Sequence, residues 1–439
     1  MTSAARLPLA GLKVIDFGDA WSSPFACTVL GDAGADVIRV EDIHRQLSTL
    51  RGPVAPPDKL DGYPDREPGA RPWNRFYLFN NSERNKRGIT LDIRHPTARE
   101  LLEELVADCD IFAINYTPRA VQQLGLTFDE LVKLNPRLVY AHVTGYGCEG
   151  SMANAVALGS TIDAWTGHMG VRGYPETTPY DTAHSYVADA AGAATLVVAC
   201  LAALERRDNT GEPQCIELAL SETLFQFLAH PALQTVISGE EPELYGSRAP
   251  DWAPQGVYRC IGEDTWITIA ARTDVEWQAL CAVLGLDADE WPDNSRRSAD
   301  HDAIDEHINR ATQAWPADAL MGELQAVGVP AMVVYEDSEV YSNAGLTGGD
   351  FLETVYHPDS GMRSYPGPLW RSRNRPMSIH QPHFGLGEHN EDVICGQLGR
   401  SADVFEQLVE DQAIGWKYSF WPEWPLPVPD EPPAKETEP

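Results

Sequence analysis

The sequence predicts an α/β protein whose first domain is built on a parallel, doubly wound sheet. Three observations carry this prediction: an apolar strand–helix–strand unit over residues 13–41, further alternation of strands and helices to residue 143, and a length of 439 residues. Strands that alternate with helices at this spacing are typical of parallel sheets with helices on both faces. A chain of this length builds two or more domains with sizeable cores.

The strand–helix–strand unit opens the predicted sheet. Lys13–Phe17 is a short apolar strand, Pro24–Asp32 is a helix that Gly34 ends, and Asp36–Glu41 is the second strand. Residues 43–75 are polar and rich in proline and glycine, which indicates an excursion or a functional loop.

Four further elements continue the alternation. Apolar residues at positions 98, 101, 102, 105 and 106 form a helical stripe, so Thr97–Asp108 is predicted as a helix. A capping box at residues 127–130 opens a short helix that stops before Pro136. Strands flank this helix at Asp110–Asn115 and Leu138–Val143.

The rest of the chain is predicted to contain a smaller α+β unit. Helices dominate residues 155–206, a strand follows at Gln214–Leu220, and a linker rich in glycine and proline covers residues 239–254. The elements predicted for the smaller unit are a hairpin at Val257–Ala271, helices at Glu276–Leu284 and Ala303–Trp315, and the segment Val329–Tyr335. Residues 336–400 are loop-rich with short strands, and residues 421–439, rich in proline and acid, predict an extended tail.

The composition restricts the class of protein. Hydrophobic residues make up 43% and charged residues 22% of the chain, which is typical of a soluble globular protein. The net charge of −32 argues against general nucleic-acid binding, because that function needs a basic surface. We find no apolar run of the roughly 18–20 residues that a membrane span needs, and residues 1–12 lack the layout of a signal peptide. We therefore expect a cytoplasmic protein that binds no membrane.

Cysteines, histidines and one basic stretch give further limits. The eight cysteines include no C-x-x-C pair and the 12 histidines no H-x-x-x-H pair, so neither a disulfide framework nor a metal site is expected. Residues 71–99 concentrate arginine and lysine in an otherwise acidic chain. This stretch indicates either an anion site or a surface whose charge is balanced by acids elsewhere in the fold.

Asp189 is the strongest single candidate for chemistry. It lies in the first turn of a predicted long helix, among alanines and a glycine in the stretch Tyr186–Gly192. The positive end of the helix dipole is expected to keep its carboxylate ionised, which suits a nucleophile better than a proton donor. The alternative is that Asp189 only caps the helix or complements its dipole.

Two common site types do not fit the sequence. A dinucleotide site after the first strand would need three glycines, but the turn has only Gly18, and Trp21 would obstruct a pyrophosphate; Glu41 at the ribose-binding distance does not rescue this interpretation. A serine hydrolase would need a G-x-S-x-G elbow, which neither Gly159-Ser160 nor Gly246-Ser247 supplies.

An ordered series of motifs resembles one family. The motifs are Gly11–Glu41 (GLKVIDFGDAWSSPFACTVLGDAGADVIRVE), Asn85-Lys86-Arg87 with Leu91-Asp92, Asn115-Tyr116, Asn135-Pro136-Arg137, Gly145-Tyr146-Gly147, Asp189, Thr210–Gln214 and Gly387-Glu388-His389. In this order, from Gly11 to about Cys395, they resemble the class III CoA-transferases, also called the CaiB/BaiF family. Asn135 we interpret as turn chemistry rather than as a site residue.

The resemblance implies a fold and an assembly. It implies a large Rossmann-like domain formed by residues 1–225 and completed by a return segment, residues 336–420. It further implies a small α+β domain at residues 226–335, followed by the tail at 421–439. Two chains are expected to thread through each other like linked rings, as a homodimer or as a heteromer with a paralogue.

The resemblance also implies a mechanism. Asp189 matches the catalytic aspartate of the family, whose carboxylate attacks an acyl-CoA thioester to give a mixed anhydride and CoA thiolate. The thiolate then captures the aspartyl carbonyl, and an acceptor carboxylate takes over the CoA through a second anhydride. Acyl-CoA and a free carboxylic acid are the expected substrates. No tightly bound cofactor and no metal is expected, because one thioester is exchanged for another.

Two sets of binding residues follow from the resemblance. The residues expected to contact CoA are Leu91, Asp92, Ile93, Arg94, Asn115, Tyr116 and Thr117, with Arg39, Lys86 and Arg119 as phosphate partners. The residues expected to line the acyl pocket are Trp21, Ser22, Trp165 and Trp252. These tryptophans suggest a bulky, partly apolar acyl group, for example an aromatic or branched dicarboxylate of the benzylsuccinate type.

Departures from the family pattern leave alternatives open. Trp21, Ser22 and Ser23 replace the smaller or amide residues often seen in the family. Asp42 and Gln123 stand where some members carry a basic residue, and residues 248–253 stand where some members have consecutive glycines. One alternative is an acyl-CoA racemase, whose histidine would be expected where the chain reads Leu158-Gly159-Ser160. The other is a non-catalytic acyl-CoA-binding subunit of a heteromeric transferase.

Overall fold

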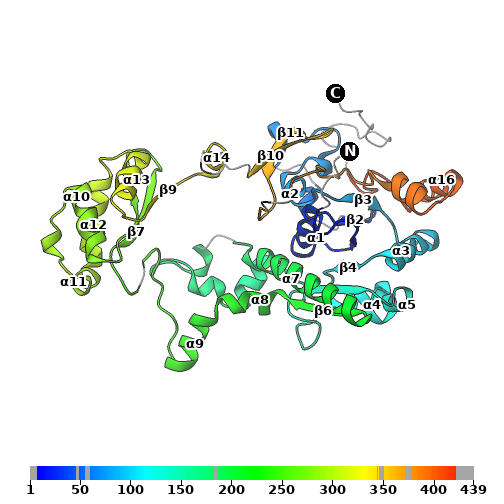
Figure 1. The fold of residues 1–439 in the computed structure, drawn as a ribbon, viewed down its shortest axis with the longest axis horizontal. Helices are drawn as coiled ribbons and strands as arrows, with labels where there is room; N and C mark the ends of the chain where they lie inside the picture. The colour runs from blue at the N-terminus through cyan, green and yellow to red at the C-terminus, as the bar shows by residue number, and fades with distance from the viewer. Residues whose placement is uncertain are drawn as a thin grey trace. The chain divides into compact units, whose positions relative to one another are not determined.

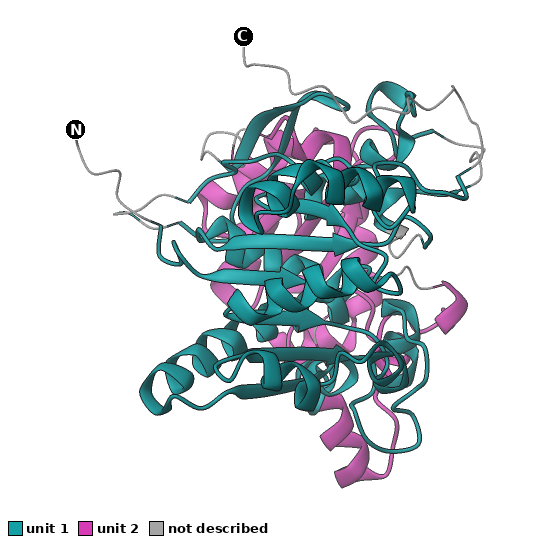
Figure 2. Ribbon diagram, turned by 90° about the vertical axis from the view of Figure 1, so that its right-hand side faces the viewer, with its two compact units in different colours: residues 1–166, 184–229, 350–439 teal, residues 167–183, 230–349 magenta. Residues whose placement is uncertain are grey.

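The structure is a computed structural model that describes residues 7–45, 49–54, 60–181, 185–248, 250–343, 345, 351–371, 373 and 377–421. The chain forms two compact units (Figure 2). Unit 1 comprises Met1–Thr166, His184–Ala229 and Asp350–Pro439, and unit 2 comprises Gly167–Ala183 and His230–Gly349. Unit 1 therefore contains both ends of the chain. The domain boundaries expected from the sequence differ from these, since they place residues 167–183 in the first segment and end the small domain at residue 335.

Unit 1 is built on a six-stranded, fully parallel sheet with the strand order β3-β2-β1-β4-β5-β6 (Figure 1). The strands are β1 (Lys13–Asp16), β2 (Asp36–Glu41), β3 (Arg87–Thr90), β4 (Ile111–Ile114), β5 (Val139–Thr144) and β6 (Gln214–Ala219). The predicted α/β class with a parallel sheet is confirmed. The chain reverses its direction of winding between β1 and β4, and ligands of such sheets bind beyond the carboxyl ends of the strands at this switch point.

Helices cover both faces of this sheet. They are α1 (Ser22–Asp32), α2 (Tyr77–Ser82), α3 (Pro96–Asp108), α4 (Pro118–Leu124), α5 (Phe128–Leu134), α6 (Gly159–Trp165), α7 (Val187–Thr210), α8 (Leu220–Phe227) and α16 (Ala402–Glu410). On one face, α3, α4, α5 and α16 bury their apolar side chains against strand residues such as Phe112 and Tyr140, whose ring centroids lie 6.1 Å apart. On the other, α1 packs on α7, which also contacts β5 and β6. Burial on both faces explains the continuous apolar runs of these strands.

Helix α7, which carries Asp189, is long and apolar enough by length and composition to cross a membrane. The sequence-based expectation that no apolar run is long enough for a membrane span is therefore wrong. Much of this run consists of alanines, which are small and only weakly apolar, so the run is easily missed in the sequence. In unit 1 one face of α7, including Gly192, Leu196 and Cys200, is buried. The opposite face exposes Val198 and Leu201. A core helix of a soluble protein meets the same criterion.

Unit 2 has a three-stranded antiparallel sheet in the order β7-β8-β9. Its strands are β7 (Gln255–Arg259), β8 (Trp266–Ala270) and β9 (Ala331–Val334), and its helices are α9 (Ala229–Ser238, from the end of unit 1), α10 (Asp274–Leu284), α11 (Asn294–Ala299), α12 (His301–Thr312), α13 (Ala317–Ala326) and α14 (Asp337–Val340). β7 and β8 form the hairpin predicted at Val257–Ala271. Buried Ile267, Trp277 and Ile308 belong to a core of its own.

The C-terminal return segment is joined to the edge of the large sheet. It begins with the antiparallel hairpin β10 (Leu352–His357) and β11 (Gly361–Pro366). Further on, Thr90 at the end of β3 donates through Oγ1 to the carbonyl of Gly415 at 2.7 Å. Trp421, predicted to begin the tail, instead stacks on Tyr418 with ring centroids 5.6 Å apart. The other residues of the predicted tail, 422–439, lie outside the described residues.

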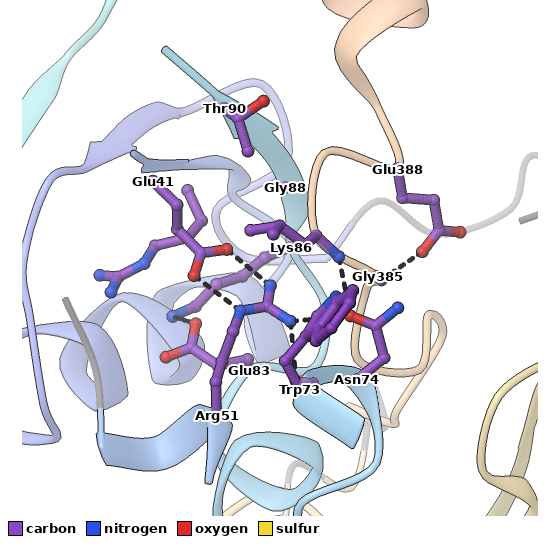
Figure 3. A network of polar contacts seen from close by, with 12 residues as sticks. Glu41, Arg51, Trp73, Asn74, Glu83, Lys86, Gly88, Thr90, Gly385 and Glu388 are labelled. Atoms are coloured by element: carbon purple, nitrogen blue, oxygen red, sulfur yellow. Dashed lines mark hydrogen bonds and ion pairs between the residues drawn. The ribbon is translucent and has the colours of Figure 1, made fainter. Parts of the chain in front are cut away.

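Where the structure describes it, at residues 43–45, 49–54 and 60–75, the predicted excursion is a packed part of unit 1. The Arg51 guanidinium is fully buried and donates from Nε and Nη2 to the two oxygens of Glu41, at 2.7 and 2.6 Å. Its Nη1 donates to the carbonyl of Trp73 and to Asn74 Oδ1, at 3.1 and 3.0 Å (Figure 3). These bonds fix the excursion against the end of β2.

Candidate active site

Asp189 lies in the first turn of α7, as the sequence predicts. The preceding Tyr186 adopts a left-handed conformation with φ 49°, which is uncommon for a non-glycine residue and marks a constrained backbone. Gly159, the first residue of α6, lies against the Asp189 side chain: a Cβ on Gly159 would lie 2.7 Å from Asp189 Oδ2. The absence of a side chain on Gly159 therefore leaves the space that the Asp189 carboxylate occupies.

The pKa of Asp189 is raised from its ordinary value of 3.8 to about 6, first by burial and second by the nearby carboxylate of Asp163. Burial disfavours the charged form of Asp189, so it acts against the ionisation that the positive end of the helix dipole was expected to favour. At pH 7 to 8 the carboxylate is still mostly ionised. It is also more basic than an ordinary aspartate, which suits a nucleophile.

Trp21 and Ser22 stand at the start of α1, and Trp21 is close to the helix that carries Asp189. The rings of Trp21 and Tyr186 meet edge to face with centroids 6.4 Å apart. The indole Nε1 is buried and has no hydrogen-bond partner among the residues that the structure describes. Ser22 is buried in the first turn of α1. Trp21 and Tyr186 thus form an aromatic surface near the start of α7.

The other two predicted pocket residues are Trp165 and Trp252. Trp165, at the end of α6, is 59% exposed and packs on Tyr146 with ring centroids 5.5 Å apart. It lines a groove of about 410 Å³ together with Thr166, Ser221, Glu222, Phe225 and Gln226. Trp252 belongs to unit 2, whereas Asp189 belongs to unit 1.

Most of the predicted CoA-binding residues follow the carboxyl ends of β3 and β4, at one edge of the sheet. Asp19, after β1, and Asn115, after β4, join the two strands at the switch point: Asn115 Oδ1 accepts from the Asp19 amide and Asn115 Nδ2 donates to the Asp19 carbonyl, each at 2.6 Å. Burial raises the pKa of the Asp19 carboxyl to about 7. Asn115 therefore shapes the turn that holds Trp21 and Ser22.

Tyr116, Thr117 and Arg119 follow Asn115 at the same edge. The Tyr116 ring is buried, and the guanidinium of Arg45, from the loop after β2, lies 5.4 Å from its centroid. Thr117 caps α4 by accepting from the Ala120 amide. Arg119 is exposed in the first turn of α4. Arg45 and Arg119 are thus exposed cations at the edge where an anionic ligand of this sheet would bind.

Residues 91–94 follow β3 at the outer part of this edge. Leu91 is buried and Ile93 is half-buried, so both help to close the core. Asp92 and Arg94 form an ion pair with 2.7 Å between Nε and the carboxylate, and Arg94 lies 3.6 Å from Asp42 as well. Arg94 remains largely exposed. A phosphate there would compete with two carboxylates for this guanidinium.

Arg39 and Lys86, predicted as phosphate partners, are inside the protein and fully buried. Arg39 pairs with Asp16 at 3.0 Å, and the Lys86 ammonium donates to Asp16, Glu83 and the carbonyl of Pro24 at 2.9, 2.6 and 2.7 Å. In this structure their charges compensate buried acids and are not presented to a ligand. The reason is that β2 and the turn before β3 direct these side chains into the core.

Three neighbours of the site were missed by the sequence analysis. Gly159 and Asp163 on α6 face Asp189, and Arg45 faces Tyr116. Arg45 lies just after a predicted strand, at the edge where ligands bind, so its position was a usable signal. The position of the histidine in racemase relatives, at Leu158-Gly159-Ser160, was a signal for Gly159. Asp163 had none, because only the packing of α6 on α7 brings it to Asp189. No group of three or more metal-ligating side chains occurs within the described ranges of the chain.

The fold and this arrangement define a family. The model of CoA-transferase family III matches residues 9–390, so the chain belongs to this family, as the resemblance of its motifs predicted. A crystal structure of a CaiB/BaiF family protein from Brucella suis superimposes with a TM-score of 0.78, at 27% identity, over 89% of this chain and 99% of that one.

Curated relatives are CoA-transferases of several substrates. A succinyl-CoA–D-citramalate CoA-transferase from Chloroflexus aurantiacus is 27% identical over 412 residues, which cover 93% of this chain and 98% of the relative. The beta subunit of a succinyl-CoA–L-malate CoA-transferase from the same organism is 26% identical over 423 residues, 94% and 99% of the two chains. An acetyl-CoA:oxalate CoA-transferase from Acetobacter aceti is 29% identical over 327 residues, 74% and 79% of the two chains.

Proposed function

We propose that this protein transfers CoA from an acyl-CoA thioester to a free carboxylic acid, with Asp189 as the nucleophile. The observation that carries this proposal is the half-buried Asp189 carboxylate at the start of α7, in the space left by Gly159, with a pKa of about 6. Membership of a family whose curated relatives are CoA-transferases supports it.

The proposed chemistry proceeds through acyl derivatives of Asp189. Its carboxylate attacks the thioester carbonyl, the C–S bond breaks, and a mixed anhydride and CoA thiolate result. The thiolate attacks the aspartyl carbonyl and releases the donor acid, which leaves an aspartyl-CoA thioester. The acceptor carboxylate repeats both steps in reverse and regenerates Asp189. Over the whole cycle one thioester is consumed and another is formed, so the cycle needs no ATP.

We propose that CoA lies along the carboxyl edge of the sheet, over the residues that follow β1 to β4. Exposed Arg45, Arg94 and Arg119 supply positive charge there, and Asn115 orders the loop before Trp21. Arg39 and Lys86, being buried, are left out of the phosphate site and support its floor. We retain a bulky, partly apolar acyl group as the expected substrate, with Trp21 as one wall.

We further propose a homodimer of interlocked chains, located in the cytoplasm. The apolar residues Val198, Phe227, Leu233, Val236 and Ile237 are exposed in the single chain, and a second copy would cover them. Because one relative is the beta subunit of a transferase, assembly with a paralogue is the alternative. Mass measurement of the purified chain separates the two, since the homodimer predicts twice the mass of the chain.

Trapping experiments test the proposed nucleophile. The full chain is incubated with a panel of acyl-CoA donors, including succinyl-CoA and acetyl-CoA, and treated with hydroxylamine or borohydride; the peptide that contains Asp189 is then weighed. We expect a hydroxamate or an alcohol at Asp189, no adduct in Asp189→Asn, and normal adduct formation in Asp208→Asn, a surface control at the other end of α7. Exchange of α-deuterium without an adduct would instead identify a racemase.

A further inference from the structure

We propose that Asp163 is a positioning residue for Asp189, whose buried negative charge favours acylation of the nucleophile. This inference rests on the proposed function and adds a residue to its site. It begins from an unusual arrangement: α6 brings a second carboxylate, 1% exposed, close to the carboxylate that is to react.

The packing of α6 on α7 gives the two acids a fixed relationship. Gly159 at the start of α6 abuts the Asp189 carboxylate, and Asp163 lies one turn further along the same helix. Ser185, just before α7, donates through Oγ to Asp163 Oδ2 at 3.2 Å. Ser185 thus links Asp163 to the segment that leads into the nucleophile's helix. The start of α6 is therefore held against the first turn of α7, and Asp163 is held to the segment just before it.

The other charged groups around Asp189 do not replace Asp163 in this role. Helix α1 packs on α7 and carries Asp32, but Asp32 is paired with Arg84 at 2.8 Å. Helix α8 packs on α7 and carries Glu222, but Glu222 is not among the causes of the raised pKa of Asp189. Of the charged side chains within the described part of the chain, only that of Asp163 contributes to the shift at Asp189.

Acylation relieves the repulsion between the two acids. When the Asp189 oxygen bonds to the acyl carbon and the C–S bond breaks, the negative charge leaves Asp189 and departs on the CoA thiolate. The ground state, with two neighbouring carboxylates, is raised in energy relative to the anhydride, which has only one. Interactions that are less favourable in the ground state than in the transition state raise the rate of the chemical step.

The test compares Asp163→Asn with Asp208→Asn in the full chain. The protonation of Asp189 is followed by ¹³C NMR of aspartate-labelled protein between pH 4 and 8, with Asp189→Asn to assign the signal. We expect a midpoint near pH 6 in the wild type and in Asp208→Asn, and a lower midpoint in Asp163→Asn, by less than half of the whole shift, because burial is its larger cause. Single-turnover acylation by succinyl-CoA at pH 8 should slow about tenfold in Asp163→Asn, with little change in the succinyl-CoA concentration at half-maximal rate.

Asp163→Ala provides a second variant if Asp163→Asn does not fold. It removes the same negative charge beside Asp189, so the midpoint of Asp189 should again fall. An unchanged midpoint in either folded variant overturns the inference, whatever the acylation rate. If no acyl-CoA in the panel acylates wild-type Asp189, the proposed function itself fails, and the inference fails with it.

Discussion

Gly159 and Asp189 are matched in shape: a methyl group on Gly159 would lie 2.7 Å from Asp189 Oδ2 and 3.1 Å from the Tyr186 ring. Both distances are too short for undisturbed packing, so the carboxylate and the aromatic ring would have to move. A displacement of this size at a reacting group can lower the rate about 100-fold.

We therefore predict that Gly159→Ala folds but acylates Asp189 at least tenfold more slowly than the wild type, measured by the release of CoA thiol in a single turnover. Gly322→Ala is the matched control, because a methyl group there meets no atom within 4 Å. It should leave the rate unchanged and stabilise α13 by roughly 0.5–1 kcal/mol. Equal rates in Gly159→Ala and the wild type would contradict the assignment of Gly159 to the site.

The pKa of Asp189 makes a prediction about stability. Its folded-state pKa of about 6 lies above the ordinary value of 3.8, so the folded protein holds this proton more tightly than the unfolded chain. Asp189 therefore costs no stability below pH 3.8, and its cost grows as the pH rises towards and past 6. A shift of about two units corresponds to at most about 3 kcal/mol.

Asp189→Asn should accordingly be more stable than the wild type at pH 8, by up to about 3 kcal/mol in urea unfolding, and should show little gain at pH 4. Asp208→Asn, which removes an exposed carboxylate from the same helix, should show no such gain at pH 8. If the difference in unfolding free energy between wild type and Asp189→Asn were the same at pH 4 and pH 8, the pKa of Asp189 would not be raised in the folded state.

The sheet was largely predictable, and its one missed strand has a physical explanation. β1, β2, β4 and β5 are apolar runs bounded by turn residues, and each lies within one or two residues of its predicted position. β3 was missed because Arg87–Thr90 contains one large apolar residue, Ile89. It is an edge strand held by pairing with β2 and by Phe384 of the return segment, which packs directly over Gly88. That contact joins residues almost 300 positions apart.

Local chemistry was likewise easier to predict than long-range pairing. The interpretation of Asn135 as a turn residue is confirmed, since its Oδ1 accepts from the Arg137 amide at 3.0 Å and its Nδ2 donates to the Cys109 carbonyl at 2.6 Å. For Lys86, the resemblance to the family and its positive charge favoured an anionic ligand. The structure gives it Asp16 and Glu83 instead, acids whose proximity depends on the folded sheet.

Lys86 therefore makes a prediction about folding. Lys86→Met would leave Asp16 and Glu83 buried with only Arg39 to compensate their charges. The loss of one partner from a buried ion pair lowers the free energy of unfolding by roughly 3–5 kcal/mol. We expect a lower urea midpoint by about this free energy. The control Lys133→Met removes an exposed ammonium from α5 and should change stability by less than about 0.5 kcal/mol. Equal stability of both variants would show that Lys86 does not support the core.

Trp21 makes the last prediction, about the choice of acyl group. Its ring meets Tyr186 at 6.4 Å, three residues before Asp189, at the carboxyl edge of the sheet where ligands bind. Removal of the indole would enlarge the acyl site and take away apolar contact. Trp21→Gly should thus lower kcat/KM for bulky acyl groups. The expected loss of transition-state stabilisation is about 1–3 kcal/mol, the range for a lost apolar side chain, and it should be smaller for small acyl groups.

A panel of acyl-CoA donors and free acids measures this change and identifies the substrate at the same time. Trp370→Gly, which removes an exposed tryptophan from the return segment, should leave the ranking of substrates as it is in the wild type. Trp21 would instead be a packing residue if its variant kept the wild-type ranking or failed to assemble. The acyl wall would then have to be sought at Tyr186, whose left-handed backbone places its ring beside Gly159.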